Sequence, residues 1–453
     1  MAEKDRDNYP LNYTKLREQV KEQLDKSNPS DAYLLLRDVL EYPGKIDDDL
    51  VWRDAFGLLE QITRDLDEIE LATLVKKIIG NPNDVDALFD LSYELYEQNL
   101  YGVAATLLKK ANEISPQDSK IVTELVSNLE ALFLNNEAYK VLTQSKKLVE
   151  SDEFCRYLLA FNALMIGNID EPGKILPSIK NSKDKDIQFM ANSLNGMLGR
   201  ALIFKENRSL DDKDLRGWHM VLNSSILLHL SPFGLDDGMN GRYSYISDSY
   251  SLIRHGIDRL KAVIDISNIN VPSVLALPDR SSRILALATS RILGIPFKDW
   301  NNIDITTPGL IVAYDLDESN SGEILKEIAD HRPGQILWAH ASNWINPFPF
   351  APDITTYLYQ HNTNPWSGGG MGYNIKSQKV TVTEPDQSDD EEISKRIIGA
   401  TVDEEYIDDL DDLLSMISIC ESLEDENRPG IFKKAGRRIR QKYGSPVQSN
   451  SFL

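Results

Sequence analysis

The front half of this chain repeats with a period of 34 residues. Leu91 and Leu125 are 34 positions apart, and Ala104 and Ala138 have the same separation. Two further apolar pairs share it: Leu95 with Leu129, and Leu108 with Leu142. A period of roughly 20–50 residues indicates a supersecondary unit that cannot bury its apolar face alone, so neighbouring units must stack. The spacing therefore predicts a stacked array of helix pairs, strongest over residues 85–180.

The best copy, residues 85–118, resembles the tetratricopeptide repeat (TPR). It has Leu91 and Ser92 where the family prefers Leu-Gly, and a small Ala104 where two helices pack closely. Pro116 stands where the second helix of the repeat should end. The resemblance implies a superhelix whose concave surface binds another protein. An irregular helical bundle is the alternative that the apolar pattern alone leaves open.

Fainter helical patterns flank this region. Residues 11–41 and 49–79 have the apolar spacing of amphipathic helices and are interpreted as divergent repeats or caps. Residues 184–206 resemble one more helix that closes the array. We therefore predict that residues 1–207 form an all-α, TPR-like scaffold.

From about residue 211 the pattern changes to that of an α/β domain, predicted over residues 211–375. Three short apolar runs alternate with helical patterns; the runs are residues 274–277, 310–314 and 336–339. Strand, helix, strand, helix, strand is typical of a parallel sheet with helical crossovers. In such sheets ligands bind beyond the carboxyl ends of the strands, so the residues after each run are candidates for a site.

The turn after the first run carries hydroxyls and guanidiniums at the start of a predicted helix. Its candidate ligand-binding residues are Arg280, Ser281, Ser282 and Arg283. Together with backbone N–H groups, such side chains can hold an anion such as phosphate. The alternative is that Ser281 or Ser282 only caps the helix.

The turn after the second run begins with two acids, Asp315 and Asp317. Because they stand at i and i+2 of extended chain, both carboxylates point to one side and could hold Mg²⁺ or two sugar hydroxyls. Ser319 and Ser321 follow and could cradle a phosphate, unless Ser321 is only a helix cap. His340 follows the third run and completes the candidate site, although a histidine in this position is more often structural.

Residues 274–297 resemble the strand and pyrophosphate loop of the type I phosphoribosyltransferase fold, and residues 310–322 resemble its acidic pair and phosphate loop. The resemblance implies a phosphorylated small-molecule ligand and Mg²⁺. The family has adjacent acids followed by Thr and Gly, whereas here Leu316 separates Asp315 from Asp317. Three hypotheses follow. The chain is an interaction scaffold whose α/β domain binds a phosphorylated ligand or is structural, an active Mg²⁺-dependent phosphoribosyltransferase-type enzyme that recruits partners through its repeats, or a purely structural assembly protein.

The net charge of −22 argues against nucleic acid as a partner, because phosphate binding needs a basic surface. Most of the imbalance lies in residues 384–426, which contain 17 acidic and 2 basic residues. We predict that residues 376–453 form a largely disordered acidic tail with a basic end over residues 433–442.

The polar first ten residues lack the apolar stretch of a secretory signal, and no run is apolar enough to span a membrane. Cys155 and Cys420 suggest neither a disulfide framework nor a zinc site. We therefore expect a cytoplasmic protein.

Overall fold

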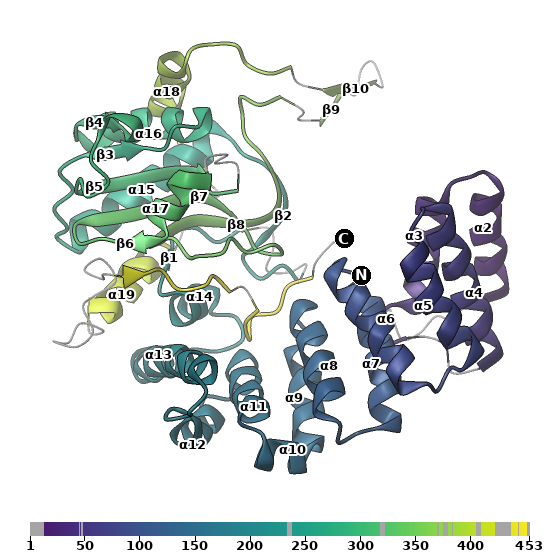
Figure 1. The fold of residues 1–453 in the computed structure, drawn as a ribbon. Coiled ribbons are helices and arrows are strands. Elements are labelled where there is room, and N and C mark those ends of the chain that lie inside the picture. Colours follow the sequence, from purple (N-terminus) through teal and green to yellow (C-terminus); the bar gives the residue numbers. More distant parts are fainter. Residues whose placement is uncertain are drawn as a thin grey trace. The chain divides into compact units, whose positions relative to one another are not determined.

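The computed structural model describes residues 13–44, 46, 49–232, 238–317, 322–368, 371–374, 379–382, 384–404, 409–421, 436–442 and 444–450. The chain divides into two compact units, Met1–Asn195 and Gly196–Leu453. The division falls inside helix α13 (Lys185–Asn207). Each unit has its own architecture and is described separately (Figure 1).

The first unit is built from pairs of antiparallel helices (Figure 1). The helices are α2 (Tyr13–Asp25), α3 (Pro29–Leu40), α4 (Asp49–Asp65), α5 (Ile69–Gly80), α6 (Val85–Glu97), α7 (Tyr101–Ile114), α8 (Ser119–Ala131), α9 (Asn135–Gln144), α10 (Lys146–Ser151), α11 (Glu153–Met165) and α12 (Asp170–Ile179). Helices α6, α8 and α11 begin at Val85, Ser119 and Glu153, so successive first helices start 34 residues apart. The prediction of a helical front half is confirmed, and its helices follow the predicted period.

Local chemistry repeats with the same period. Each first helix begins after an aspartate whose carboxylate accepts hydrogen bonds from backbone N–H groups of the first turn; these N-caps are Asp84, Asp118 and Asp152. The turn inside each pair contains one residue in the left-handed region, with φ near 60–80°; these are Asn99 (62°), Phe133 (60°) and Gly167 (81°). Capping and turn geometry therefore define the helix pair as the repeating unit.

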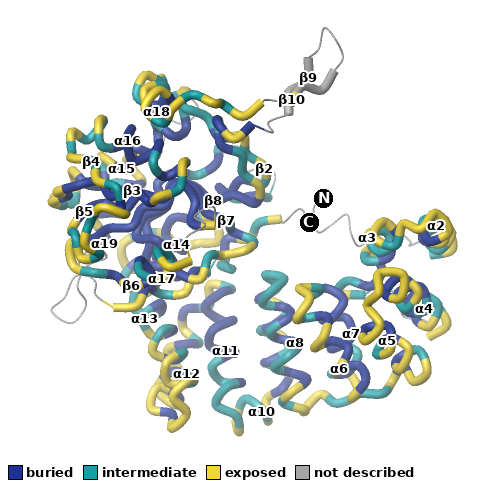
Figure 2. Tube along the Cα trace, turned by 45° about the horizontal axis from the view of Figure 1, so that its top comes forward, coloured by how far each residue is buried: buried dark blue, intermediate teal, exposed yellow. Residues whose placement is uncertain are grey.

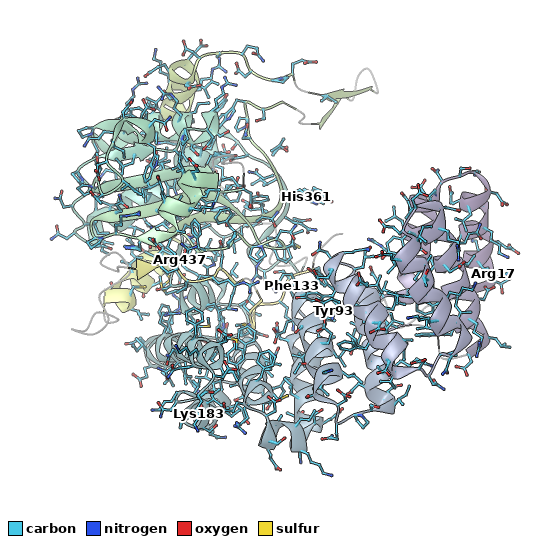
Figure 3. All side chains as sticks on the ribbon, viewed as in Figure 1. Arg17, Tyr93, Phe133, Lys183, His361 and Arg437 are labelled. Atoms are coloured by element: carbon cyan, nitrogen blue, oxygen red, sulfur yellow. The ribbon has the colours of Figure 1, made fainter. Side chains whose placement is uncertain are left out.

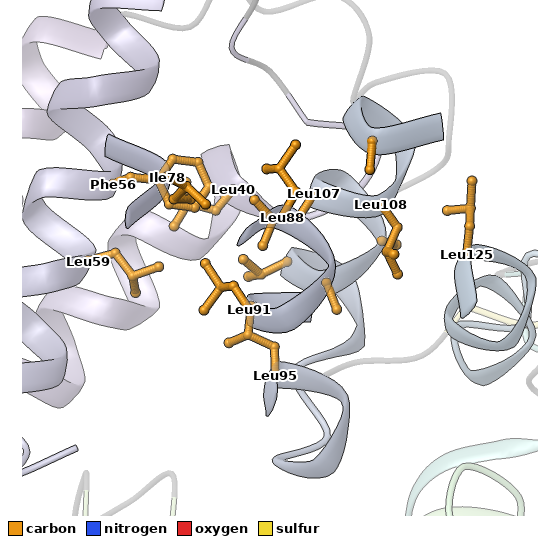
Figure 4. Close-up of a cluster of buried hydrophobic side chains, with 14 of the residues drawn as sticks. Leu40, Phe56, Leu59, Ile78, Leu88, Leu91, Leu95, Leu107, Leu108 and Leu125 are labelled. Atoms are coloured by element: carbon orange, nitrogen blue, oxygen red, sulfur yellow. The ribbon is translucent and has the colours of Figure 1, made fainter. Parts of the chain in front are cut away.

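The apolar residues of the repeat form one continuous core (Figure 4). Leu91 and Leu125, which occupy equivalent positions in successive repeats, are both buried in it. Ala104 and Ala138 are completely buried at the equivalent positions of α7 and α9. The small side chains allow the helices of a pair to approach closely, as the sequence predicted for Ala104.

We expect Ala104→Leu to lower the free energy of unfolding by about 1–3 kcal/mol, because the larger side chain overpacks a filled contact. Urea denaturation followed by circular dichroism measures the change. Ala131→Leu, at a half-buried position at the end of α8, is the matched control and should change stability little. Equal unfolding midpoints for the two variants would contradict the close packing at Ala104.

The second unit contains a parallel β-sheet (Figure 1). Its elements in chain order are α14 (Leu215–Asn223), β1 (Ile226–Leu227), β2 (Tyr243–Ser247), α15 (Tyr250–Ile266), β3 (Val274–Ala276), α16 (Arg280–Leu293), β4 (Phe297–Asp299), η1 (Trp300–Asn302), β5 (Gly309–Asp315), α17 (Gly322–Ile328), β6 (Asp330–His331), β7 (Gln335–Asn343) and β8 (Ile354–Thr363). The strand order is β1-β8-β7-β5-β3-β4, and β2 also pairs with β8. All these pairings are parallel, so the predicted parallel sheet is confirmed.

The structure differs from the predicted elements at one edge of the sheet. Helix α14 ends at Asn223 and gives way to β1, and β2 precedes α15, so two strands stand before the first of the three predicted runs. The long strand β8 was not predicted, although its first seven residues are all buried (Figure 2). Burial on both faces removes the polar alternation by which a half-exposed strand is recognised.

The order of the strands positions the candidate site. Five neighbouring strands of the sheet lie in the order β4-β3-β5-β7-β8. If they are numbered along the chain from β3, this order is 2-1-3-4-5. The chain therefore adds strands on one side of β3 first and then on the other, and the change of direction lies between β3 and β5. Doubly wound sheets bind ligands at such a switch point. Because β3 and β5 are adjacent and parallel, the turns that follow them lie at the same edge, as the sequence required.

The described parts of residues 376–453 contain regular helices and strands, and from residue 386 they pack on the second unit, so the expectation of a largely disordered tail is wrong for these parts. They form β10 (Lys379–Val382), which pairs with β9 (Met371–Asn374), and then α18 (Asp390–Gly399), α19 (Leu410–Glu421) and β11 (Gly436–Arg437). β11 pairs with β6 of the sheet unit. The physical reason is charge pairing, because carboxylates of this segment meet arginines of the sheet unit.

A buried ion pair joins the basic end of the chain to the sheet. Arg438 Nη1 donates to Asp353 Oδ2 (2.8 Å), and Arg438 Nε donates to the carbonyl of Ile328 (2.9 Å). Asp353 also accepts from the backbone N–H of Leu337. Burial alone would raise the pKa of Asp353, but the Arg438 guanidinium and the neighbouring His331 hold it well below its usual range. The basic end is therefore part of the fold.

Arg438→Ala should lower the free energy of unfolding by about 3–5 kcal/mol, because it leaves the Asp353 carboxylate buried without its partner. The adjacent Arg437 provides the control, since its side chain is 70% exposed and Arg437→Ala should change stability by no more than about 0.5 kcal/mol. Chemical denaturation of both variants makes the comparison. A similar small effect for both would show that the C-terminal segment does not hold the sheet.

Candidate functional site

The predicted hydroxyls at the start of α16 serve the fold. Ser281 Oγ accepts a hydrogen bond from Trp366 Nε1 (3.0 Å), and Ser282 Oγ accepts from the backbone N–H of Tyr314 (2.9 Å). The helix cap is Asp279, whose carboxylate accepts from the N–H of Ser282 (2.8 Å), so neither serine caps the helix. Both hydroxyls therefore tie α16 to neighbouring segments.

The arginines of the same turn bind the chain's own acidic segment. Arg280 donates to the carbonyl oxygens of Asp386 (3.1 Å) and Ser388 (2.6 Å), and its Nε lies 3.4 Å from Asp390 Oδ1. Arg283 Nε lies 3.3 Å from Asp390 Oδ2, and its Nη1 contacts the aspartate that ends β4. The sequence predicted that these guanidiniums hold an anion such as phosphate. They do contact oxygen atoms, but these atoms belong to the same chain.

The two predicted acids occupy the end of β5. Asp315 is almost completely buried; its Oδ2 accepts from the Tyr359 hydroxyl, and its Oδ1 accepts from the N–H of Asp317 (3.0 Å). Burial raises the pKa of Asp317. Ser319 and Ser321 lie outside the described residues. Among the residues that the structure does describe, no group of three or more His, Cys, Asp or Glu side chains is placed to hold a metal ion.

His340 belongs to a buried polar network beneath α15. Asp248 Oδ2 accepts from the Tyr314 hydroxyl (2.7 Å) and lies 3.1 Å from His340 Nε2. Burial, followed by the Asp248 carboxylate, raises the pKa of Tyr314 well above its usual value. Gly256 of α15 makes room for the imidazole, since a Cβ at that position would lie 3.1 Å from His340 Nδ1. The geometry supports a structural role for His340.

Three more histidines are buried in this unit, two of them, His229 and His255, near this network. The rings of His229 and His255 meet edge to face at 5.1 Å. Burial, assisted by Arg259, lowers the pKa of His255 to about 3; burial, assisted by Arg242, lowers that of His219 to about 3. All three are held neutral near pH 7, since the pKa of His229 is also well below its usual value. In the sequence these residues are scattered and show no common motif.

Several residues that contact the predicted site residues could not be identified from the sequence. Asp248 stands immediately before the helix cap Ser249, a position that composition does not distinguish from an ordinary strand-to-helix turn. Tyr357 and Tyr359 alternate on β8, and this alternation is a signal that could have identified the strand. The acidic partners of Arg280 were assigned to a separate tail because they are more than 100 residues away in sequence.

No protein-family model matches this chain, and no curated protein matches its sequence. Two solved structures of MamA AMB-1 are similar to part of it. One is 20% identical, covering 40% of this chain and 97% of that chain with a TM-score of 0.22. The other is 18% identical, covering 41% of this chain and 93% of that chain with a TM-score of 0.23. At these scores the interpretation rests on the chain's own residues.

No helix among the described residues combines the length and the apolar character needed to cross a membrane.

The buried histidines make the second unit sensitive to acid. The unfolded chain protonates His219 and His255 below about pH 6.5, whereas the folded chain keeps them neutral to about pH 3. Their contribution to stability is therefore complete above pH 6.5 and is lost as the pH falls toward 3, by up to about 1.4 kcal/mol per pH unit for each residue. Urea unfolding at several values between pH 7 and pH 5 measures this slope.

His255→Gln should reduce the dependence of unfolding free energy on pH, whereas His361→Gln, at an exposed position, should leave it unchanged. If the native chain and both variants show the same dependence of unfolding free energy on pH, the buried histidines are not its cause.

Proposed function

We propose that this chain is a protein-interaction scaffold, in which a TPR-like unit binds a partner protein and the α/β unit has a structural role. The observation that carries the proposal is the solvent face of α6. In a stacked helical repeat, binding surfaces are formed by the exposed faces of successive first helices. Contacts link α6 to α8 and α8 to α11, so these first helices form one layer.

The exposed face of α6 is acidic and carries one aromatic ring. Its exposed residues are Asp86, Asp90, Tyr93, Glu94 and Glu97. α6 contains no basic residue, and none of its four carboxylates forms an ion pair with a described residue. The Tyr93 side chain is 48% exposed (Figure 3). A charged face without internal partners remains available to a partner of opposite charge.

The neighbouring helix extends this acidic face. Glu124 of α8 is half-buried, and burial followed by the nearby Glu97 carboxylate raises its pKa. A carboxylate whose pKa is raised by a neighbouring carboxylate is stabilised in its charged form when a cation is placed beside it. We therefore infer that the partner presents a segment rich in lysine or arginine, with one cation over the Tyr93 ring.

The α/β unit offers less support for a ligand. Ser281, Ser282 and Asp315 are engaged in hydrogen bonds within the unit, and Arg280 binds carbonyl oxygens of the same chain. An active transferase would need these groups to face a substrate. We therefore propose that the unit, with these contacts in place, is a structural module, in preference to an active Mg²⁺-dependent phosphoribosyltransferase or an open phosphate site.

A dye-labelled, lysine- and arginine-rich peptide should bind the full chain, and its affinity should fall as salt is added, because exposed charges are screened. The double reversal Asp90→Lys with Glu94→Lys should weaken binding at least about tenfold, since it converts attraction into repulsion at the proposed face. Fluorescence anisotropy titrations measure both effects.

The matched control is Glu18→Lys with Glu22→Lys on α2, which changes the net charge of the chain equally. It should alter affinity no more than about twofold. An equal loss in both double variants would mean that only the total charge matters, and the proposed face would be abandoned.

A further inference from the structure

The acidic residues 386–391 lie against the start of α16 and are called the clamp. Their oxygen atoms meet guanidiniums of α16, the helix that follows β3 at the switch point of the sheet. Arg280 binds two clamp carbonyls and the Asp390 carboxylate, which also lies near Arg283. Arg291, farther along α16, pairs with the Glu391 carboxylate. The contact between clamp and α16 is therefore made by arginine side chains, which meet both carbonyl oxygens and carboxylates of the clamp.

These ion pairs are accessible to solvent. The side chains of Arg280, Arg283 and Asp390 are 42%, 39% and 27% exposed. Pairs with this exposure are weakened by salt, because mobile ions screen charges at the surface. The arginines of the clamp contact thus differ from Arg438, whose ion pair is buried.

The following turns of α18 are attached differently. Ile393 and Ile397 are completely buried, and α18 packs on both α16 and α15. Arg254 of α15 donates to the carbonyl of Ile398 (2.6 Å). We call residues 393–398 the anchor. Apolar burial is insensitive to charge screening, so the anchor remains attached under conditions that weaken the clamp.

Arg396 determines the shape of the clamp. It contacts the Asp386 carboxylate and donates to Ser388 Oγ (2.8 Å) and Glu392 Oε1 (2.8 Å). None of these partners lies on α16. By bending the segment back on itself, Arg396 directs the carbonyls of Asp386 and Ser388 toward Arg280.

We propose that the clamp is an autoinhibitory contact that closes the ligand edge of the sheet and opens reversibly about the anchor. Its oxygens occupy Arg280, which begins α16 directly after β3 and so stands beside the switch point between β3 and β5, where doubly wound sheets bind ligands. When the ion pairs weaken, the clamp swings away and leaves the Arg280 guanidinium free, whereas Arg283 keeps its contact with Asp299. Ile393 and Ile397 stay buried. This device concerns the α/β unit and does not depend on the partner proposed for the repeats.

The test measures the accessibility of Arg280 in the full chain. Phenylglyoxal modifies free guanidiniums, and peptide mapping by mass spectrometry gives the rate at each arginine. The 70% exposed Arg437 is the reference for reagent activity, and the buried Arg438 reports whether the unit is folded. Three variants are compared with the native chain: Arg396→Gln, Asp390→Asn and Asp265→Asn.

Arg396→Gln should raise the rate at Arg280, relative to Arg437, at least about threefold, because the clamp loses its shape although no partner of Arg280 is removed. Asp390→Asn and about 1 M NaCl should have the same effect, since both weaken the ion pairs. Asp265→Asn removes a comparable exposed ion pair, that with Lys261 on α15, and should leave the rate unchanged.

An unchanged rate at Arg280 in Arg396→Gln and in high salt would overturn the proposal and make residues 386–391 a permanent part of the domain. Labelling of Arg438 in a variant would indicate unfolding. In that case the salt series on the native chain decides the question.

Discussion

Buried arginines are the constraint that organises the α/β unit. The Arg216 and Arg259 side chains are 1% and 5% exposed, and a buried guanidinium without a counter-ion is strongly destabilising. Asp409 lies 2.6 Å from Arg216 and 3.3 Å from Arg259, and Asp412 lies 2.6 Å from Arg216. Because these aspartates precede or begin α19, the C-terminal segment is required to complete the interior of a unit that begins about 200 residues earlier.

This constraint explains why the acidic stretch misled composition-based reasoning. A segment with few apolar residues and high net charge cannot bury enough surface to fold alone, and on that basis residues 376–453 were expected to be disordered. The reasoning holds for an isolated segment. Here Asp409 and Asp412 find their partners on α14 and α15, and the partner of Asp412 is 196 residues away in sequence. Net charge counts charges but does not locate their partners.

Features set by near neighbours in sequence were predictable. The 34-residue period follows from apolar spacing within each helix pair, and the strands β3, β5 and β7 follow from short apolar runs bounded by turns. The adjacency of the turns after β3 and β5 also followed, because parallel strands present their carboxyl ends at one edge. The contacts at that edge did not follow. Whether Asp315 faces a ligand or Tyr359 depends on β8, a strand that joins the sheet from farther along the chain.

The charges of the α/β unit differ from those of α6 in whether they are paired with other described residues, and this difference bears on function. In the α/β unit, carboxylates and guanidiniums meet across long sequence separations, so an external ligand must first displace a contact that already exists. On α6, carboxylates at 86, 90, 94 and 97 share one exposed helix without a basic neighbour, so their mutual repulsion is relieved only by a group from outside the helix. Recognition is energetically easier where no internal partner must be displaced. This difference supports our proposal that the repeat unit binds a partner directly, whereas a ligand of the α/β unit would first have to release contacts that the unit already makes.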